Sequence, residues 1–337
     1  MTNTQSKVVR RYEWVDLAKL LGLYLMILGH QNLVSENCSQ FIYTFHMPLF
    51  FILSGVFFKK RTLAESWHQS WRTLICPFLI IATTWCFFYA VLYAKNGILF
   101  TKESYSHFLG MYISPGKDFY SLSSLCHALW FLLALAWIKM CATTFRRTID
   151  WLLISAVCLT GFFCLKHYDV TLPLAIDSAL LAFPFYAIGH FASDYIKQNT
   201  HFFYEIALAI VCFVITFAIY RRNGIVDVNK CLYGNNICLF YIGGISGSLM
   251  ICHISKAIVI PLLNKSIYPK SFIRSILSGS VIIIGYNAYT AGVIRQILLL
   301  LTGKSCGLAV GLIVIGILYP VILLAKKYFP VIIGFRK

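Results

Sequence analysis

The sequence predicts an all-α, polytopic membrane protein, a bundle of about ten transmembrane helices. Of its 337 residues, 59% are hydrophobic and only 12% are charged, and the mean hydropathy is +0.75. A soluble domain cannot hide that much apolar surface. The formal net charge of +17 would favour a nucleic-acid partner in a soluble protein, but here Lys and Arg occupy short loops between apolar runs. This pattern indicates membrane topology and no nucleic-acid partner.

The apolar runs define the expected spans. A helix needs about 20 residues to cross a hydrocarbon core of about 30 Å. Ten ranges approach or exceed that length: 13–33, 40–58, 73–94, 124–144, 150–166, 172–191, 203–220, 236–256, 275–301 and 306–325. The first lacks a small-residue cleavage site after it, so we expect it to remain as a transmembrane helix. We therefore expect one membrane-embedded domain over residues 1–337, with short tails.

The distribution of basic residues predicts the orientation. Of the 29 Lys and Arg residues, eighteen fall in segments on the side of the two termini and eight on the other side. The positive-inside rule then places both termini in the cytoplasm of a multi-pass protein of the plasma (inner) membrane. Lys19, Lys139 and Arg295 remain inside spans.

The 12 Cys residues are scattered, without a C-x-x-C motif or a Cys/His pair at zinc spacing, so they predict no metal site.

Ionisable side chains interrupt the first span. Lys19 and His30 are eleven residues apart, which places them on the same helix face about 16 Å apart along the axis. Asp16 lies one turn before Lys19. An ionisable group inside a membrane costs a few kcal/mol, so each needs a partner or a function. In a purely structural explanation, Asp16 and Lys19 neutralise each other, and His30 caps or packs the helix end. In a functional explanation, the three residues form a polar stripe directed into the bundle.

A second histidine lies near the same membrane face. His46 precedes Pro48 in "FIYTFHMPLFFILSGVFF", residues 41–58, and a short loop joins this span to the first one. Two histidines at one end of a helix pair form a candidate proton-transfer site.

Together, "RYEWVDLAKLLGLYLMILGH" and "FHMPLFFILSGVFFKKR" resemble the start of the acyltransferase 3 family of integral membrane acyltransferases, and within it the fucose 4-O-acetylase-like group. The family is marked by a basic residue and a histidine with ten residues between them. Lys19 and His30 match this motif. The resemblance implies about ten helices and transfer of an acyl group, often acetyl from acetyl-CoA, onto sugars of surface polysaccharides. It is dense over the first 61 residues and looser beyond them.

Later stretches also resemble family segments. "WRTLICPFL" at 71–79 offers Arg72, although Gln69 replaces an Arg often found three residues earlier. "HALWFLLAL" at 127–135 contains Trp130, and "LLAFPFYAIGHF" at 180–191 matches a Pro-Phe-Gly span. "IGYNAYTAGVIRQ" at 284–296 has Arg295 where relatives often carry a histidine.

The resemblance implies roles for these residues. His30 is the expected general base for a sugar hydroxyl, with an acyl-histidine intermediate equally allowed. His46 could orient His30, contact the acceptor or satisfy a helix end. Lys19 and Arg72 would bind the phosphates of acetyl-CoA. Arg295 could stabilise an oxyanion, bind a phosphate, or pair with Asp16 or Asp177, and Trp130 could stack on a sugar or pack in the core.

Other functions stay open. A transporter or flippase of lipid-linked saccharides would share the many spans and the cationic interior. An acetylase of a small molecule, or a structural member of the family, would share the motif. A periplasmic saccharide acceptor would have to bind through the loops 95–123 and 221–235.

Overall fold

The computed structural model describes residues 11–30, 33–117, 127–145, 147–198, 201–264, 269–303 and 306–334. In these ranges all the regular secondary structure is helical except for one small hairpin. The helices are α1 (Glu13–His30), α2 (Glu36–Tyr43), α3 (His46–Val56), α4 (Leu63–Ser70), α5 (Cys76–Lys95), α6 (Lys102–Ile113), α7 (Trp130–Ala142), α8 (Thr148–His167), α9 (Ile176–Phe191), α10 (Ser193–Lys197), α11 (Phe202–Asn223), α12 (Ile237–Asn264), α13 (Lys270–Ser278), α14 (Ser280–Thr302) and α15 (Gly307–Tyr328). The all-α fold class is confirmed.

Short elements join some of these helices. A π-helical turn, Trp71–Ile75, connects α4 to α5, and short 3-10 turns cover His127–Leu129 and Pro330–Ile333. The strands β1 (Val226–Asp227) and β2 (Leu232–Tyr233) pair antiparallel and form a hairpin between α11 and α12.

Within the described ranges, seven helical segments are long and apolar enough to cross a membrane: Glu36–Val56, Leu63–Lys95, Thr148–His167, Phe202–Asn223, Ile237–Leu263, Ser280–Thr302 and Gly307–Tyr328. Each of the ten expected ranges overlaps a helix. However, α7 and α9 are shorter apolar helices, and α1 carries Glu13, Asp16 and Lys19 within its 18 residues. The multi-pass architecture is therefore confirmed, while ten spans and cytoplasmic termini stay predictions.

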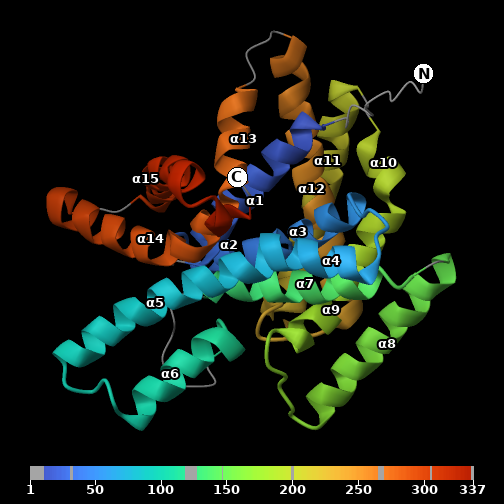
Figure 1. Cartoon of the computed structure of the whole chain (residues 1–337). Coiled ribbons are helices and arrows are strands. Elements are labelled where there is room, and N and C mark those ends of the chain that lie inside the picture. The colour runs from blue at the N-terminus through green and yellow to red at the C-terminus, as the bar shows by residue number, and fades with distance from the viewer. Residues whose placement is uncertain are drawn as a thin grey trace, which may run out of the picture.

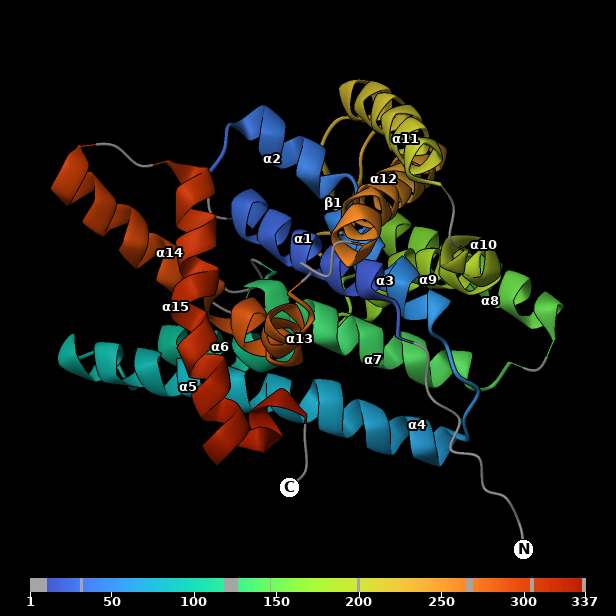
Figure 2. The ribbon, with the colours of Figure 1, turned by 90° about the horizontal axis from the view of Figure 1, so that it is seen from above.

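The helices divide into a central and a peripheral group. α1 runs through the middle of the molecule, where α3, α12, α13, α14 and α15 pack against it. α5 and α8 extend outward on opposite sides (Figures 1 and 2). Burial agrees with this arrangement: 67% of the α2–α3 span is buried inside the protein, against 17% of α8. The apolar surface of α8 is thus left for lipid.

Two glycines allow α3 and α9 to touch through their backbones. A Cβ atom at Gly55 would lie 2.0 Å from the Tyr186 carbonyl oxygen, and one at Gly189 would lie 2.1 Å from that of Ile52. Small residues permit such close approach between membrane helices. This contact fixes α3, which carries His46 at its first turn.

Candidate active site

α1 lines two different cavities, one near each of its ends. His30 borders a cavity of about 520 Å³, which we call the His30 cavity. Lys19 borders a cavity of about 210 Å³, which we call the Lys19 cavity. Helix α7 also reaches both, since Trp130 lines the first and Lys139 the second. Helices α1 and α7 therefore each contribute side chains to both cavities.

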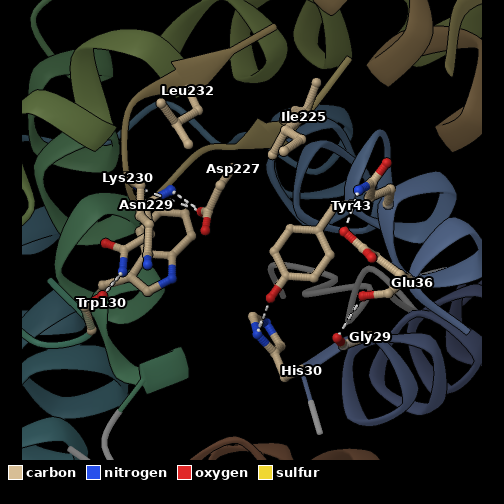
Figure 3. Close-up of a pocket in the computed structure, with 14 residues that line it drawn as sticks. Gly29, His30, Glu36, Tyr43, Trp130, Ile225, Asp227, Asn229, Lys230 and Leu232 are labelled. Atoms are coloured by element: carbon tan, nitrogen blue, oxygen red, sulfur yellow. Dashed lines mark hydrogen bonds between the residues drawn. The ribbon is translucent and has the colours of Figure 1, made fainter. Parts of the chain in front are cut away.

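The His30 cavity is built from segments far apart in the sequence (Figure 3). The end of α1, the helix α2, the loop after α6, the start of α7 and the β1–β2 hairpin all contribute to it. Its described lining residues are Gly29, His30, Glu36, Ser39, Gln40, Tyr43, Gly116, Trp130, Ile225, Val226, Asp227, Asn229, Lys230 and Leu232. Carboxylates, an imidazole, a phenol and an indole thus face one space, a mixture suited to a polar organic ligand.

His30 is held by an aromatic partner from α2. The Tyr43 hydroxyl and His30 Nδ1 are 2.6 Å apart, and Figure 3 shows the hydroxyl directed at the imidazole. If Nδ1 carries the proton and donates it to the Tyr43 oxygen, His30 Nε2 carries the lone pair that a general base needs. The hydrogen bond therefore fixes the ring orientation and can select the basic tautomer.

His46 lies behind this pair and does not line the cavity. Its ring centroid is 5.4 Å from that of His30 and 4.9 Å from that of Tyr43, and the residue is 1% exposed. His46 Nδ1 donates to the Ile42 carbonyl oxygen at 3.0 Å, because a carbonyl can only accept. The structure thus brings the two predicted histidines into contact, with His46 in a supporting position.

The hairpin opposite His30 presents a carboxylate. Asp227 Oδ1 accepts hydrogen bonds from the backbone N–H groups of Asn229, at 2.9 Å, and Lys230, at 3.3 Å. Burial raises the pKa of Asp227 above its ordinary value, while these two N–H groups and the charges of Lys230 and Lys117 oppose the rise. Asp227 points into the space between Trp130 and Tyr43 (Figure 3).

The Lys19 cavity is strongly basic. Lys19, Lys59, Arg61 and Lys139 all line it, together with polar side chains such as Gln69 and Ser66. None of its described lining residues is acidic. Four cations around one small space would repel one another unless an anion occupied it. This arrangement favours a phosphate-bearing ligand.

Asp16 is neutralised by other partners than Lys19. Its carboxylate accepts two hydrogen bonds from Arg11, at 2.8 Å and 3.1 Å, and lies 3.7 Å from Arg274 Nε. Arg274 also pairs with Glu13 at 3.3 Å. Lys19 makes no ion pair in the part of the chain that the structure describes. Lys19 is thereby left available to the Lys19 cavity.

The remaining predicted residues are dispersed. Trp130 is 2% exposed and closes one side of the His30 cavity. Arg72 lies in the π-helical turn after α4 and is not one of the described residues that line the Lys19 cavity. Arg295 is exposed on α14 and is not one of the described residues that line either cavity. Asp177 pairs with Lys117.

Several site residues were missed by sequence reasoning. Tyr43, Asp227 and Lys230 have no distinctive spacing, and only the fold brings them to His30. Lys139 did carry a signal, because a lysine inside an apolar span needs an explanation. Of the two loops expected to bind an acceptor, 221–235 supplies the hairpin, and 95–123 supplies Gly116; residues 118–123 lie outside the described ranges.

The apolar helices define a multi-pass membrane protein. Residues 12–267 match the acyltransferase 3 family model, an acyltransferase domain. Since the match covers more than half of the chain, the chain belongs to this family of membrane acyltransferases. No curated protein and no solved structure matches the chain. The helices α13, α14 and α15 lie beyond the matched range and pack on α1.

Proposed function

We propose that the protein transfers an acetyl group from acetyl-CoA to a hydroxyl of a cell-surface or lipid-linked saccharide, as in the fucose 4-O-acetylase-like group. The plasma (inner) membrane is the proposed location. One observation carries the proposal: α1 presents His30 to one cavity and Lys19 to a second, basic cavity. Eleven residues of helix separate them by about 16 Å, so a single extended donor such as acetyl-CoA could contact both.

In this proposal the Lys19 cavity binds donor phosphates. Lysine offers a compact point charge and arginine a planar fork of donors, and both types line this cavity as Lys19, Lys59, Arg61 and Lys139. At about 210 Å³ the cavity accommodates phosphate groups and leaves the pantetheine arm to extend along α1 toward His30.

The chemistry takes place in the His30 cavity. His30 Nε2 accepts the proton of the acceptor hydroxyl as its oxygen attacks the thioester carbonyl carbon. The carbon–sulfur bond then breaks, and the leaving thiolate of CoA takes the proton back from the imidazolium. The Tyr43 hydroxyl, 2.6 Å from Nδ1, stabilises the charge on the ring. The products are an acetyl ester and CoA, and no further reactant is needed.

The test uses the full-length protein in membrane vesicles supplied with acetyl-labelled acetyl-CoA and a saccharide fraction. The proposal expects label in an ester that mild alkali releases from the saccharide. Release of acetate alone, without a labelled saccharide, would contradict the acceptor class. Saccharide crossing the vesicle membrane without acetylation would favour a transporter, and labelling of an amino acid would favour a small-molecule acetylase.

A further inference from the structure

We propose that Asp227 on the β1–β2 hairpin selects the acceptor, by accepting a hydrogen bond from a second hydroxyl of an uncharged saccharide while His30 activates the first. The inference rests on the proposed acetyl transfer and adds to it a residue that determines specificity. Asp227 contacts the acceptor away from the reacting atoms, so it determines which acceptor binds and takes no part in the bond changes.

The two oxygens of Asp227 have different surroundings. Oδ1 accepts both hydrogen bonds from the turn of the hairpin, from the N–H groups of Asn229 and Lys230. Among the described residues, no hydrogen bond involves Oδ2. A carboxylate accepts through both oxygens, so the turn holds the side chain in place and leaves one oxygen for a ligand in the cavity.

The hairpin itself is firmly anchored. Asn229 is 5% exposed, and its Nδ2 donates to the Gly116 carbonyl oxygen at 2.9 Å. The Ser178 hydroxyl donates to the Asn229 carbonyl oxygen at 3.1 Å. At the base of the hairpin, the Asn223 side chain donates to the Tyr233 carbonyl oxygen at 2.8 Å. These bonds join the hairpin to α9, α11 and the loop after α6, so Asp227 is positioned before any acceptor binds.

The charge of the cavity indicates the class of acceptor. Glu36 and Asp227 supply two carboxylates, and Lys230 is the one cationic side chain among the described lining residues. Carboxylates accept hydrogen bonds from hydroxyl groups and repel other carboxylates. Trp130 adds an aromatic face of the kind on which sugar rings pack. An uncharged, polyhydroxylated ligand therefore fits this cavity better than a uronic acid does.

The experiment compares Asp227→Asn with the wild type as full-length proteins in proteoliposomes. Asparagine has the same shape and keeps an oxygen that can accept from the turn, so the hairpin is expected to fold. Asp169→Asn is the matched control, since Asp169 is exposed on the loop after α8 and does not line the His30 cavity. The acceptors are neutral methyl hexopyranosides, their singly deoxygenated forms and the corresponding uronic acids.

We expect Asp227→Asn to raise the KM for the neutral acceptor about tenfold or more, since a hydrogen bond to a charged group is lost. The KM for acetyl-CoA should not change, and discrimination against uronic acids should weaken. At least one deoxygenated acceptor should be used equally well by both proteins, because it lacks the hydroxyl that Asp227 contacts.

Three results would overturn the inference. One is an unchanged acceptor KM in Asp227→Asn while the wild type transfers acetyl normally. Another is an equal loss with every deoxygenated acceptor, which would assign Asp227 a structural role. A wild type that acetylates no saccharide at all would instead refute the proposed function, and the inference with it.

Discussion

The hydrogen bond between Tyr43 and His30 predicts that the Tyr43 hydroxyl contributes to kcat. Replacing Tyr43 by Phe keeps the ring and removes the hydroxyl that lies 2.6 Å from His30 Nδ1. We expect kcat to fall about ten- to a hundredfold, because the base loses its fixed orientation and tautomer, and the pH dependence of kcat to shift. The measurement is a pH–rate profile at saturating acetyl-CoA.

Tyr220→Phe is the matched control for this variant. The Tyr220 hydroxyl donates to Asn37 Oδ1, within α2, at 3.2 Å, but Tyr220 does not line the His30 cavity. An unshifted pH profile in Tyr43→Phe, or the same change in both variants, would show that Tyr43 has only a packing role.

The basic residues of the Lys19 cavity can be separated from Arg72. We expect Lys19→Ala and Lys139→Ala each to raise the KM for acetyl-CoA about tenfold, because each removes a charged contact to a phosphate. Arg72→Ala should leave this KM within about twofold, since Arg72 does not line the cavity. The measurement is the KM for acetyl-CoA from steady-state kinetics. A larger rise of this KM in Arg72→Ala than in Lys139→Ala would place the phosphate site near Arg72 and contradict the Lys19 cavity as that site.

Residue-scale prediction from the sequence reached only part of this site. The spacing of Lys19 and His30 was informative because a helix converts sequence distance into direction. Tyr43 and Asp227 were not predictable in the same way, since their position at His30 depends on how α2 and the hairpin fold against α1. The partners of Asp16 were likewise unpredictable, because Arg274 is remote in sequence and approaches only through α13.

At the scale of elements, the contact between α3 and α9 should be sensitive to a single methyl group. A Cβ at Gly55 or Gly189 would overlap a backbone carbonyl oxygen, at 2.0 Å and 2.1 Å respectively. We expect Gly55→Ala and Gly189→Ala each to lower the stability by about 1–3 kcal/mol or more, seen as a lower Tm in detergent.

Gly316→Ala provides the control for these variants. A Cβ at Gly316, inside α15, would meet nothing within 4 Å, so the substitution should be neutral or stabilise the helix by about 0.5–1 kcal/mol. Equal losses of Tm in all three variants would argue against a special contact between α3 and α9.

Most elements followed from the hydropathy pattern, whereas their ends and interruptions did not. All ten apolar ranges contain helix. The range 40–58 is nevertheless divided between α2 and α3, and this break orients Tyr43 and His46 toward His30. The hairpin within 221–235 has strands of only two residues each, too short to produce a recognisable alternation of polar and apolar residues.

At the scale of the whole molecule, the predicted orientation can be tested with cysteines. The Tyr24 hydroxyl donates to the Leu308 carbonyl oxygen at 3.0 Å, so the start of α15 lies beside the second half of α1. Cys38 and Cys306 are exposed and fall on the expected extracytoplasmic side. In variants that keep one cysteine each, both should react with a membrane-impermeant maleimide in intact cells.

An inner-face control completes this experiment. Ala64→Cys in a cysteine-free background places a thiol on the exposed surface of α4, close in sequence to Arg61 of the Lys19 cavity. It should react only after the cells are permeabilised. The reverse pattern would invert the topology and expose the His30 cavity to the cytoplasm.

The most direct test of the account compares acetyl transfer by the wild type with that by His30→Gln, at matched protein levels in membrane vesicles. His167→Gln, an exposed histidine at the end of α8, controls for loss of an imidazole elsewhere. We expect His30→Gln to lose at least about a hundredfold in transfer from labelled acetyl-CoA to saccharide, with the KM for acetyl-CoA retained, and His167→Gln to match the wild type. Undiminished transfer by His30→Gln would contradict the assignment of His30 as the catalytic base.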